Sequence, residues 1–246
     1  MAMTYHQLGN TEFLASDLAA AEGWYRKSLE IEEALGNRPG MAMTYHQLGM
    51  VAQDRDDLAA AEGWYRKSLE IKEALGNRPD MASSYHQLGV VAYQRGDLTA
   101  AEGWCRKSLE ITEALGHRPG MAVSYHQLGI VAQERGDLTA AEGWYHKAQE
   151  INETLSNLQG MALIYGQLGL LSEIRKDIAT GLDWMVRSIA LLSEFPHPAT
   201  RPVLPHLVRL TKMLGVPALE ASWQRATGTP LPDHIRSAVV AAIDKQ

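Results

Sequence analysis

The stretch Tyr45-His46-Gln47-Leu48-Gly49 determines the fold, because it recurs along the chain at intervals of forty residues. Identical copies begin at Tyr5, Tyr85 and Tyr125, and the variant Tyr165-Gly166-Gln167-Leu168-Gly169 ends the series. A tryptophan keeps the same interval in all five repeats, at Trp24, Trp64, Trp104, Trp144 and Trp184. Residues 41–80 and 81–120 are identical at 29 of 40 positions. Such a period predicts a stacked solenoid, in which each repeat buries its apolar face only against its neighbours.

Each repeat is predicted to contain two helices. In the second repeat, apolar or small residues at positions 45, 48, 49 and 52 form one helical stripe, so we expect a first helix over about 42–55. A second helix is expected over about 58–75, and Gly76-Asn77-Arg78-Pro79 is expected to end it, because proline cannot continue a helix. Between the two helices, Arg95-Gly96-Asp97 of the third repeat supplies a glycine for the turn and an aspartate for the next N-cap.

The period sets the expected repeat boundaries at 1–40, 41–80, 81–120, 121–160 and 161–195. Beyond Pro196 the register is lost, and short helices are expected over 204–214, 218–227 and 233–242. Trp223 and Leu219 give this segment an apolar face, so residues 196–246 are expected to cap the exposed end of the fifth repeat. The predicted fold is therefore all-α: a right-handed helical solenoid of five forty-residue repeats with a C-terminal helical cap, and no strand.

The repeat resembles the tetratricopeptide repeat (TPR) at the positions that define that motif. The motif's aromatic-x2-Leu-Gly-x2-small start, its later Ala-x3-aromatic and its closing proline correspond to Tyr45, Leu48, Gly49, Ala52, Ala61, Tyr65 and Pro79. The length of forty residues, in place of the usual thirty-four, is similar to the long-helix repeats of kinesin light chains and of bacterial multidomain regulators. The resemblance covers about residues 1–195. It implies a protein or peptide partner, bound in a concave groove that the first helices line.

The charge distribution disfavours nucleic acid as the ligand. The net charge of −6 combines an acidic repeat region with a basic C-terminus: residues 201–246 carry six Lys or Arg and three Asp or Glu, which leaves −9 for residues 1–200. An acidic array is poorly suited to a phosphate backbone. The N-terminus has no basic segment followed by an apolar run, and no apolar stretch reaches membrane-spanning length. We therefore expect a cytoplasmic protein without nucleic-acid or membrane partners.

The residues that usually signal chemistry are absent or unsuitably spaced. The chain has no Gly-x-Ser-x-Gly, P-loop or Gly-x-Gly-x-x-Gly sequence. The equivalent histidines His6, His46, His86 and His126 are expected to form a ladder, but repeats about 8–10 Å apart cannot share a zinc ion whose bonds are about 2 Å. Cys105, the single cysteine, replaces a tyrosine and is expected to be buried and inert. We therefore predict no catalytic residue, cofactor or metal, and a core position for the five tryptophans.

The predicted binding surface is a stripe of the first helices that varies between otherwise similar repeats. Its members are mainly apolar, amide or histidine residues, almost without lysine or arginine. Tyr93 is the expected anchor, because it is the only aromatic residue of the stripe in the central repeats and aromatic residues dominate binding energy at interfaces. The acidic members favour a neutral or basic partner, and drift of an unconstrained surface is the alternative explanation of the variation. The predicted set is His46, Met50, Gln53, Asp54, His86, Val90, Tyr93, Gln94, His126, Ile130, Gln133 and Glu134.

The first repeat departs from the pattern of the others at its helix end. Phe13 and Leu14 stand where the other repeats have mostly polar residues. Because exposed apolar clusters tend to be interfaces, we expect either self-association through the N-terminal repeat or contact with an upstream segment of a larger protein.

Three functional hypotheses follow from these patterns. The leading one is a non-enzymatic protein-interaction scaffold that binds a peptide or protein segment in its concave groove. The alternative is a regulatory or self-assembling sensor array from a larger bacterial signalling ATPase or transcriptional regulator. A small-molecule binder or an enzyme is the third.

Overall fold

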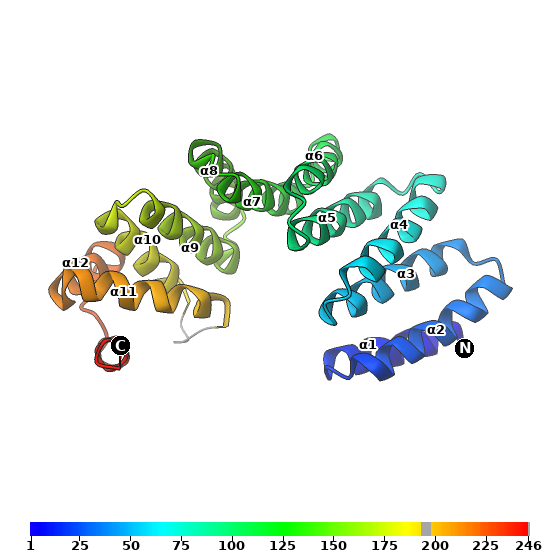
Figure 1. Ribbon diagram of the computed structural model, residues 1–246, viewed down its shortest axis with the longest axis horizontal. Coiled ribbons are helices and arrows are strands. Elements are labelled where there is room, and N and C mark those ends of the chain that lie inside the picture. Colours follow the sequence, from blue (N-terminus) through cyan, green and yellow to red (C-terminus); the bar gives the residue numbers. More distant parts are fainter. Residues whose placement is uncertain (193–197, 246) are drawn as a thin grey trace. The chain divides into compact units, whose positions relative to one another are not determined.

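The computed structural model describes residues 1–192 and 198–245 of the 246-residue chain, and within them every regular element is a helix (Figure 1). The repeat region contains α1 (Ala2–Leu14), α2 (Leu18–Ala34), α3 (Arg38–Asp54), α4 (Leu58–Ala74), α5 (Arg78–Gln94), α6 (Leu98–Ala114), α7 (Arg118–Glu134), α8 (Leu138–Thr154), α9 (Leu158–Ile174) and α10 (Ile178–Ala190). The C-terminal segment contains the 3-10 helix η1 (Pro198–Val203), α11 (Leu204–Leu214), α12 (Val216–Thr227) and α13 (Asp233–Ile243). The all-α repeat architecture is confirmed.

The chain forms two compact parts, which we call the N-terminal half (residues 1–131) and the C-terminal half (residues 132–246). In the N-terminal half, each helix from α1 to α5 packs against the helix that follows it. In the C-terminal half, α8 packs on α9, and α9 packs on α10. Helix α7 crosses the division between the halves.

Short polar side chains cap the helices at each repeat boundary. Asp57 Oδ1 accepts a hydrogen bond from Ala60 N–H at 3.0 Å, and Asn77 Oδ1 accepts one from Asp80 N–H at 3.4 Å. The predicted turn glycine is confirmed at Gly96, whose φ of +77° lies in the left-handed region that glycine enters without steric cost. Equivalent cap and turn residues repeat along the chain, so the same local signals set nearly every helix boundary.

The first helices begin earlier than the sequence pattern predicted. Helix α3 begins at Arg38 rather than near residue 42, and α5 begins at Arg78. Pro79 therefore does not end the second helix of its repeat; it lies in the first turn of the next helix, after the N-cap Asn77. Proline is well suited to this position, because the backbone N–H that it lacks would have no helical partner there.

The core of each repeat depends on close contact between its two helices. Tyr65 is fully buried, and a Cβ atom at Gly49 would lie 2.6 Å from Tyr65 Cε1. The third repeat keeps the same proximity with Cys105, whose Sγ would lie 2.6 Å from a Cβ at Gly89. Cys105 is fully buried, as predicted, and burial raises the pKa of its thiol to about 12. The glycine of the motif is thus explained by the space that the second helix requires.

The tryptophans are half-buried, so the predicted core position holds only in part: Trp64 and Trp104 pack against a buried core cluster but keep part of their surface exposed. Trp64 stacks on Tyr45 with ring centroids 5.7 Å apart, and Lys67 Nζ lies 4.5 Å from its ring centroid. Trp104 stacks on Tyr85 in the same way. Each tryptophan covers the outside of the helix pair, where a cationic neighbour also contacts it, and the fully buried position belongs to the adjacent residue of the second helix.

Hydrogen bonds and ion pairs join each repeat to the next. Tyr85 OH donates to Glu73 Oε1 at 2.7 Å, and Tyr45 OH donates to Glu33 in the preceding pair of repeats. Glu62 pairs with Arg66 on its own helix and also with Arg95 of the following repeat. The same kinds of link recur along the chain because near-identical repeats make near-identical interfaces.

The C-terminal helices share a core with the fifth repeat. Leu182, Met185 and Ile189 of α10 form one apolar cluster with Leu207 and Leu210 of α11, and the cluster extends to Trp223 and Val239. Helix α12 packs on α10, and α13 packs on α11. The expected boundary between residues 195 and 196 lies outside the described residues.

Candidate interaction surface

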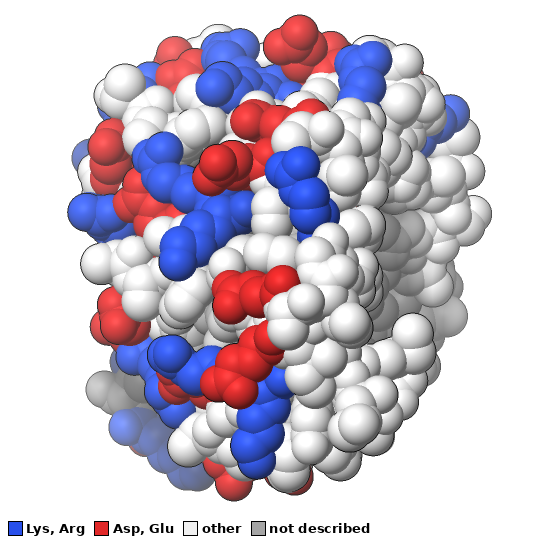
Figure 2. All heavy atoms as spheres, turned by 90° about the vertical axis from the view of Figure 1, so that its right-hand side faces the viewer, with Lys and Arg blue, Asp and Glu red and all other residues white. Residues whose placement is uncertain are grey.

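The odd-numbered helices present an uncharged surface in the N-terminal half. Helices α3 and α7 carry charged residues only near their ends, and α5 likewise, whereas α4 and α6 carry Glu, Arg and Lys along their length. Figure 2 shows a face of the molecule on which Lys, Arg, Asp and Glu gather on one side and leave the other side to uncharged residues. Met43 is 55% exposed and Val123 is 47% exposed at equivalent positions of α3 and α7. We call the residues at 43, 46 and 50, with their equivalents in α5 and α7, the odd-helix stripe.

The histidines of the stripe are half-buried between repeats. His6 Nδ1 lies 3.2 Å from Thr44 Oγ1 of the second repeat, and the rings of His46 and Tyr65 have centroids 5.3 Å apart. Burial lowers the pKa of His46 to about 4, and burial lowers the pKa of His126 to about 4 as well. Both imidazoles are therefore neutral near pH 7. His6 thus contacts the next repeat, and His46 packs against the second helix of its own repeat.

The glutamines at the far end of the stripe are engaged in hydrogen bonds within the protein. Gln53 Oε1 accepts from Tyr65 OH at 3.0 Å, and Gln53 Nε2 donates to Gln94 Oε1 at 2.9 Å. In the C-terminal half, Gln133 Oε1 accepts from Tyr145 OH at 3.1 Å. The structure thus brings Gln53 and Gln94 together. It also gives the glutamines a role in holding the helix pairs.

The presence of a tyrosine at position 93 has a structural explanation that does not depend on a binding partner. Where the second helix carries Tyr65, the first helix carries Gln53, and their side chains form a hydrogen bond. In the third repeat, the second helix carries Cys105, which has no hydroxyl group, and the first helix carries Tyr93 instead of glutamine. Tyr93 is half-buried and packs against the cluster of Ala92, Ala101 and Val131. Its packing therefore accounts for part of its presence, and its role as an anchor stays a prediction.

The remaining residues of the predicted binding set differ in their exposure to solvent. Met50, Val90 and Ile130 are half-buried along the stripe, and Asp54 and Glu134 are exposed at the ends of α3 and α7. Glu173, the equivalent acidic residue of the fifth repeat, is bound by His206 and Arg209 of α11. It is therefore occupied by the protein's own C-terminal segment and contributes little to any attraction for a basic partner.

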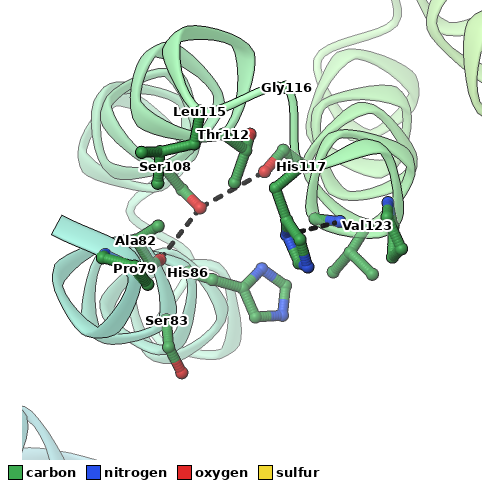
Figure 3. A pocket seen from close by; sticks show the side chains of 13 residues that line it. Pro79, Ala82, Ser83, His86, Ser108, Thr112, Leu115, Gly116, His117 and Val123 are labelled. Carbon is green, nitrogen blue, oxygen red and sulfur yellow. Dashed lines mark hydrogen bonds between the residues drawn. The ribbon is translucent and has the colours of Figure 1, made fainter.

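A cavity of about 560 Å³ opens on the stripe between α5, α6 and the start of α7. We call it the junction cavity (Figure 3). Ala82 and Ser108 are buried in its wall, as are Thr112 and Ser124. The imidazoles of His86 and His117 both point into the space between α5 and the start of α7. Of the predicted binding residues, His86 lines this cavity.

The junction cavity lies beside a buried position of the second helix at which each repeat has a different residue. This position, which we call the junction position, holds Glu32, Lys72, Thr112 and Asn152, each at most 6% exposed. Sequence reasoning missed it, because charged and polar residues in a helix suggest a solvated face. The available signal was the contrast between this variation and the near-identity of the flanking residues.

The apolar residues at the N-terminal repeat are not equivalent to each other. Leu14 is 85% exposed, whereas Phe13 is half-buried and packs with Leu18 against the cluster that contains Tyr25. Of the two residues predicted for self-association, Leu14 is the one that α1 presents on the surface.

Neither a metal centre nor a membrane-spanning helix is found in the described part of the chain. Within residues 1–192 and 198–245, no group of three or more His, Cys, Asp or Glu side chains is placed to hold a metal ion. The same residues include no helix that is both long and apolar enough to cross a bilayer.

The comparison with known families identifies the repeats. A family model described as "Tetratricopeptide repeat" matches residues 1–74 and 80–154, which is more than half of the chain. The chain therefore belongs to the tetratricopeptide repeat family. No curated protein matches it at a significant level.

Solved structures share the fold at low sequence identity. BtubC (BKLC) from P. vanneervenii matches with a TM-score of 0.69 and 19% identity, covering 93% of each chain. A signal transduction ATPase with numerous domains from Pyrococcus horikoshii, which has a tetratricopeptide repeat sensor, matches with a TM-score of 0.75 and 15% identity over 99% of this chain and 38% of that protein. A putative kinesin light chain from Podospora anserina with nearly identical TPR-like repeats matches with a TM-score of 0.65 and 13% identity, over 77% of this chain and 93% of that one. TPR domains are usually non-catalytic and typically mediate protein–protein interaction.

Proposed function

We propose that the chain is a non-enzymatic interaction scaffold, which binds a peptide or protein segment in a groove along the odd-helix stripe. The observation that carries the proposal is the exposure of uncharged side chains at equivalent positions of successive first helices, with Met43 at 55% and Val123 at 47%. Exposed apolar residues at Met43 and Val123, with the uncharged Ser83 between them, on helices that are charged only near their ends are typical of an interaction site. The general role of the family in protein–protein interaction supports the same proposal.

The partner segment is proposed to be neutral or basic. Asp54 at the end of α3 is exposed, and no basic side chain lies between Arg38 and Asp54 on that helix. An acidic rim beside an uncharged surface attracts a basic segment and repels an acidic one. The half-buried histidines add hydrogen-bonding capacity without positive charge, because burial keeps the pKa of His46 at about 4.

Site-specific photo-cross-linking tests this proposal. A benzophenone amino acid at position 43 or 123 would report contacts of the odd-helix stripe, and one at the exposed position 66 of α4 would serve as the matched control. We expect partner cross-links from positions 43 and 123 and few from position 66. Cross-links that form only from position 66 would move the binding surface to the even-numbered helices.

A regulatory or self-assembling sensor array is the second candidate function. It is supported by the similarity to the Pyrococcus horikoshii protein, whose description includes a tetratricopeptide repeat sensor, and this chain spans about 38% of that protein. The exposed Leu14 at the N-terminal repeat is a further apolar contact point for a second copy or another segment. Under this proposal, the repeats would transmit assembly or ligand binding to a catalytic part of a larger signalling protein in the cytoplasm.

A further inference from the structure

The junction cavity exists because the third repeat has a short side chain, Thr112, where the second repeat has the long Lys72. Between the second and third repeats, Lys72 extends across the interface, and its Nζ donates to Ser84 Oγ at 2.8 Å. Between the third and fourth repeats, the equivalent residue is Thr112, whose hydroxyl turns back to Leu109 O at 2.9 Å. The next helix changes in step, since Asp80 near Lys72 is replaced by Gly120. Compared with the junction between the second and third repeats, the junction between the third and fourth therefore lacks both the long lysine side chain and the carboxylate near it.

The cavity contains hydrogen-bonding groups that the protein only partly uses. His86 Nδ1 is buried and has no hydrogen-bond partner. His117 Nδ1 accepts a hydrogen bond from Gly120 N–H at 3.2 Å, so the neutral ring carries its proton on Nε2 and can donate from there. Ser124 Oγ donates to Ser108 Oγ at 3.3 Å, and Ser108 Oγ donates to Ala82 O at 2.9 Å. A buried polar atom without a partner costs free energy, and an occupant with a polar edge would recover it once the His86 ring turns to expose Nδ1.

The cavity suits an uncharged occupant. Its lining has no Lys, Arg, Asp or Glu side chain. Burial lowers the pKa of His86, so its imidazole is neutral near pH 7. A charged group entering this wall would lose its hydration and find no opposite charge, which makes its binding unfavourable.

The size and the walls of the cavity favour a flat aromatic group. A volume of about 560 Å³ lies within the range of pockets that hold drug-sized ligands, about 300–1,000 Å³, and so admits a bicyclic ring. Two imidazoles point into the cavity, and aromatic rings pack favourably in stacked or edge-to-face arrangements (Figure 3). Pro79 and Val123 at the mouth are exposed and apolar. The mouth can therefore pack against the atoms that connect such a ring to the backbone of a partner segment.

We propose that the junction cavity receives a tryptophan or tyrosine side chain of the partner segment, whose N–H or O–H hydrogen-bonds inside the cavity. This inference rests on the proposed function, because Ser83 and Val123 at the mouth belong to the odd-helix stripe. The cavity opens at the protein surface between exposed residues, as an anchor pocket for a side chain of a longer segment does. The third repeat junction is thus the specificity-determining part of the stripe.

The chain itself supplies the variant that closes the cavity. Thr112→Lys, His117→Asn and Gly120→Asp give the junction between the third and fourth repeats the residues found at these three positions between the second and third, and leave Ser83 and Val123 at the mouth unchanged. Because the protein already folds with that arrangement one repeat earlier, the triple variant is expected to fold. The reciprocal variant, Lys72→Thr with Asn77→His and Asp80→Gly, is expected to open a second cavity between the second and third repeats.

Two measurements on the full chain test the proposal. In the first, indole and p-cresol, which are the side chains of tryptophan and tyrosine, are titrated while the imidazole NMR signals of His86 and His117 are followed. We expect shifts of both signals in the native chain, no shift of His86 in the closed variant, which lacks His117, and a second binding event in the reciprocal variant. In the second measurement, a random peptide library is selected on the native chain and compared with the closed variant. We expect peptides with a tryptophan or tyrosine, binding the closed variant at least about tenfold more weakly.

The outcomes separate this inference from the proposed function. Peptides that bind the native chain and the closed variant equally would overturn the anchor pocket and leave the scaffold function standing. If indole binds but no peptide does, the cavity is a small-molecule site, and both the anchor and the peptide-binding function are overturned. Failure of indole and p-cresol to shift either imidazole would overturn the cavity as an aromatic site.

Discussion

Lys72 and Ser84 form a buried hydrogen bond across the junction between the second and third repeats, with Nζ 2.8 Å from Oγ. Lys72 is only 5% exposed, and burial lowers the pKa of its ammonium group. Asp80 in the first turn of α5 lies close enough to oppose that shift in pKa. A charged residue in this position is thus held by two residues of the next helix.

Replacing Lys72 should distinguish its packing from its charge. Lys72→Ala removes the side chain that fills the junction, so we expect a loss of about 2 kcal/mol in the free energy of unfolding. Lys72→Met keeps most of the volume and removes the desolvated charge, so its cost should be below about 1 kcal/mol. Urea denaturation followed by circular dichroism measures both. A methionine variant as strongly destabilised as the alanine variant would show that the ammonium group, and not the packing of the side chain, holds the junction.

Two glycines of one repeat should respond to alanine in opposite directions. A Cβ atom at Gly49 would lie 2.6 Å from Tyr65 Cε1, so Gly49→Ala should destabilise the protein by about 1–3 kcal/mol. Gly63 lies on the exposed side of α4 and has nothing within 4 Å of such an atom, so Gly63→Ala should stabilise by about 0.5–1 kcal/mol. Thermal denaturation of the two variants checks this. Equal effects would mean that the helices are less closely packed than Gly49 and Tyr65 indicate.

Acidification should destabilise the protein before the carboxylates titrate. Burial lowers the pKa of both His46 and His126 to about 4, below the ordinary histidine value of 6.5. The unfolded chain therefore takes up protons first. The stability from the neutral histidines is complete above about pH 6.5 and is lost as the pH falls towards about 4, by a few kcal/mol for the pair.

The measurement is the melting temperature at pH 7 and pH 5, with the double variant His46→Gln and His126→Gln as the control. Glu22, whose pKa is lowered by the hydrogen bond from Arg26, loses its contribution only below the ordinary carboxylate range and does not interfere. We expect the double variant to lose less stability over this interval than the native chain. An identical loss in both would exclude the buried histidines as its cause.

Leu14 should determine any self-association of the N-terminal repeat. Its side chain is 85% exposed, so Leu14→Gln removes apolar surface without disturbing the core. Light scattering at high concentration should then give a lower apparent mass than for the native chain, with an unchanged melting temperature. Phe13→Glu is unsuitable for this purpose, because Phe13 packs against the core cluster of the first repeat. A native chain that is already monomeric at high concentration would contradict self-association.

The repeat period predicted most of the fold because each structural signal recurs in the same place. Tyr45, Gly49 and Tyr65 occupy positions whose counterparts are almost unchanged along the chain, and their packing follows from helical spacing. The helix starts were less predictable, since Pro79 fits both the end of one helix and the first turn of the next. The core position predicted for the tryptophans holds only in part, because strict repetition also arises from stacking on a neighbouring tyrosine at the surface.

The candidate site was harder to predict than the fold. Both Val123 and Thr112 occupy positions that vary between repeats, and this variation alone does not show that Val123 is exposed and Thr112 is buried. Tyr93 is a unique aromatic residue of the stripe, but its packing against the cluster of Ala92, Ala101 and Val131 is a structural reason for its presence. The junction cavity results from a missing side chain, and space of this kind becomes visible only when neighbouring helices are placed.

The most direct test of the account is the affinity of a library-selected peptide for Val123→Glu and for the exposed control Arg66→Ser, measured by calorimetry. Val123 is 47% exposed at the mouth of the junction cavity, so a carboxylate there should scarcely change the melting temperature. The account predicts a dissociation constant at least about tenfold higher for Val123→Glu and unchanged for Arg66→Ser. Native affinity in Val123→Glu, or a loss confined to Arg66→Ser, would contradict binding along the odd-helix stripe.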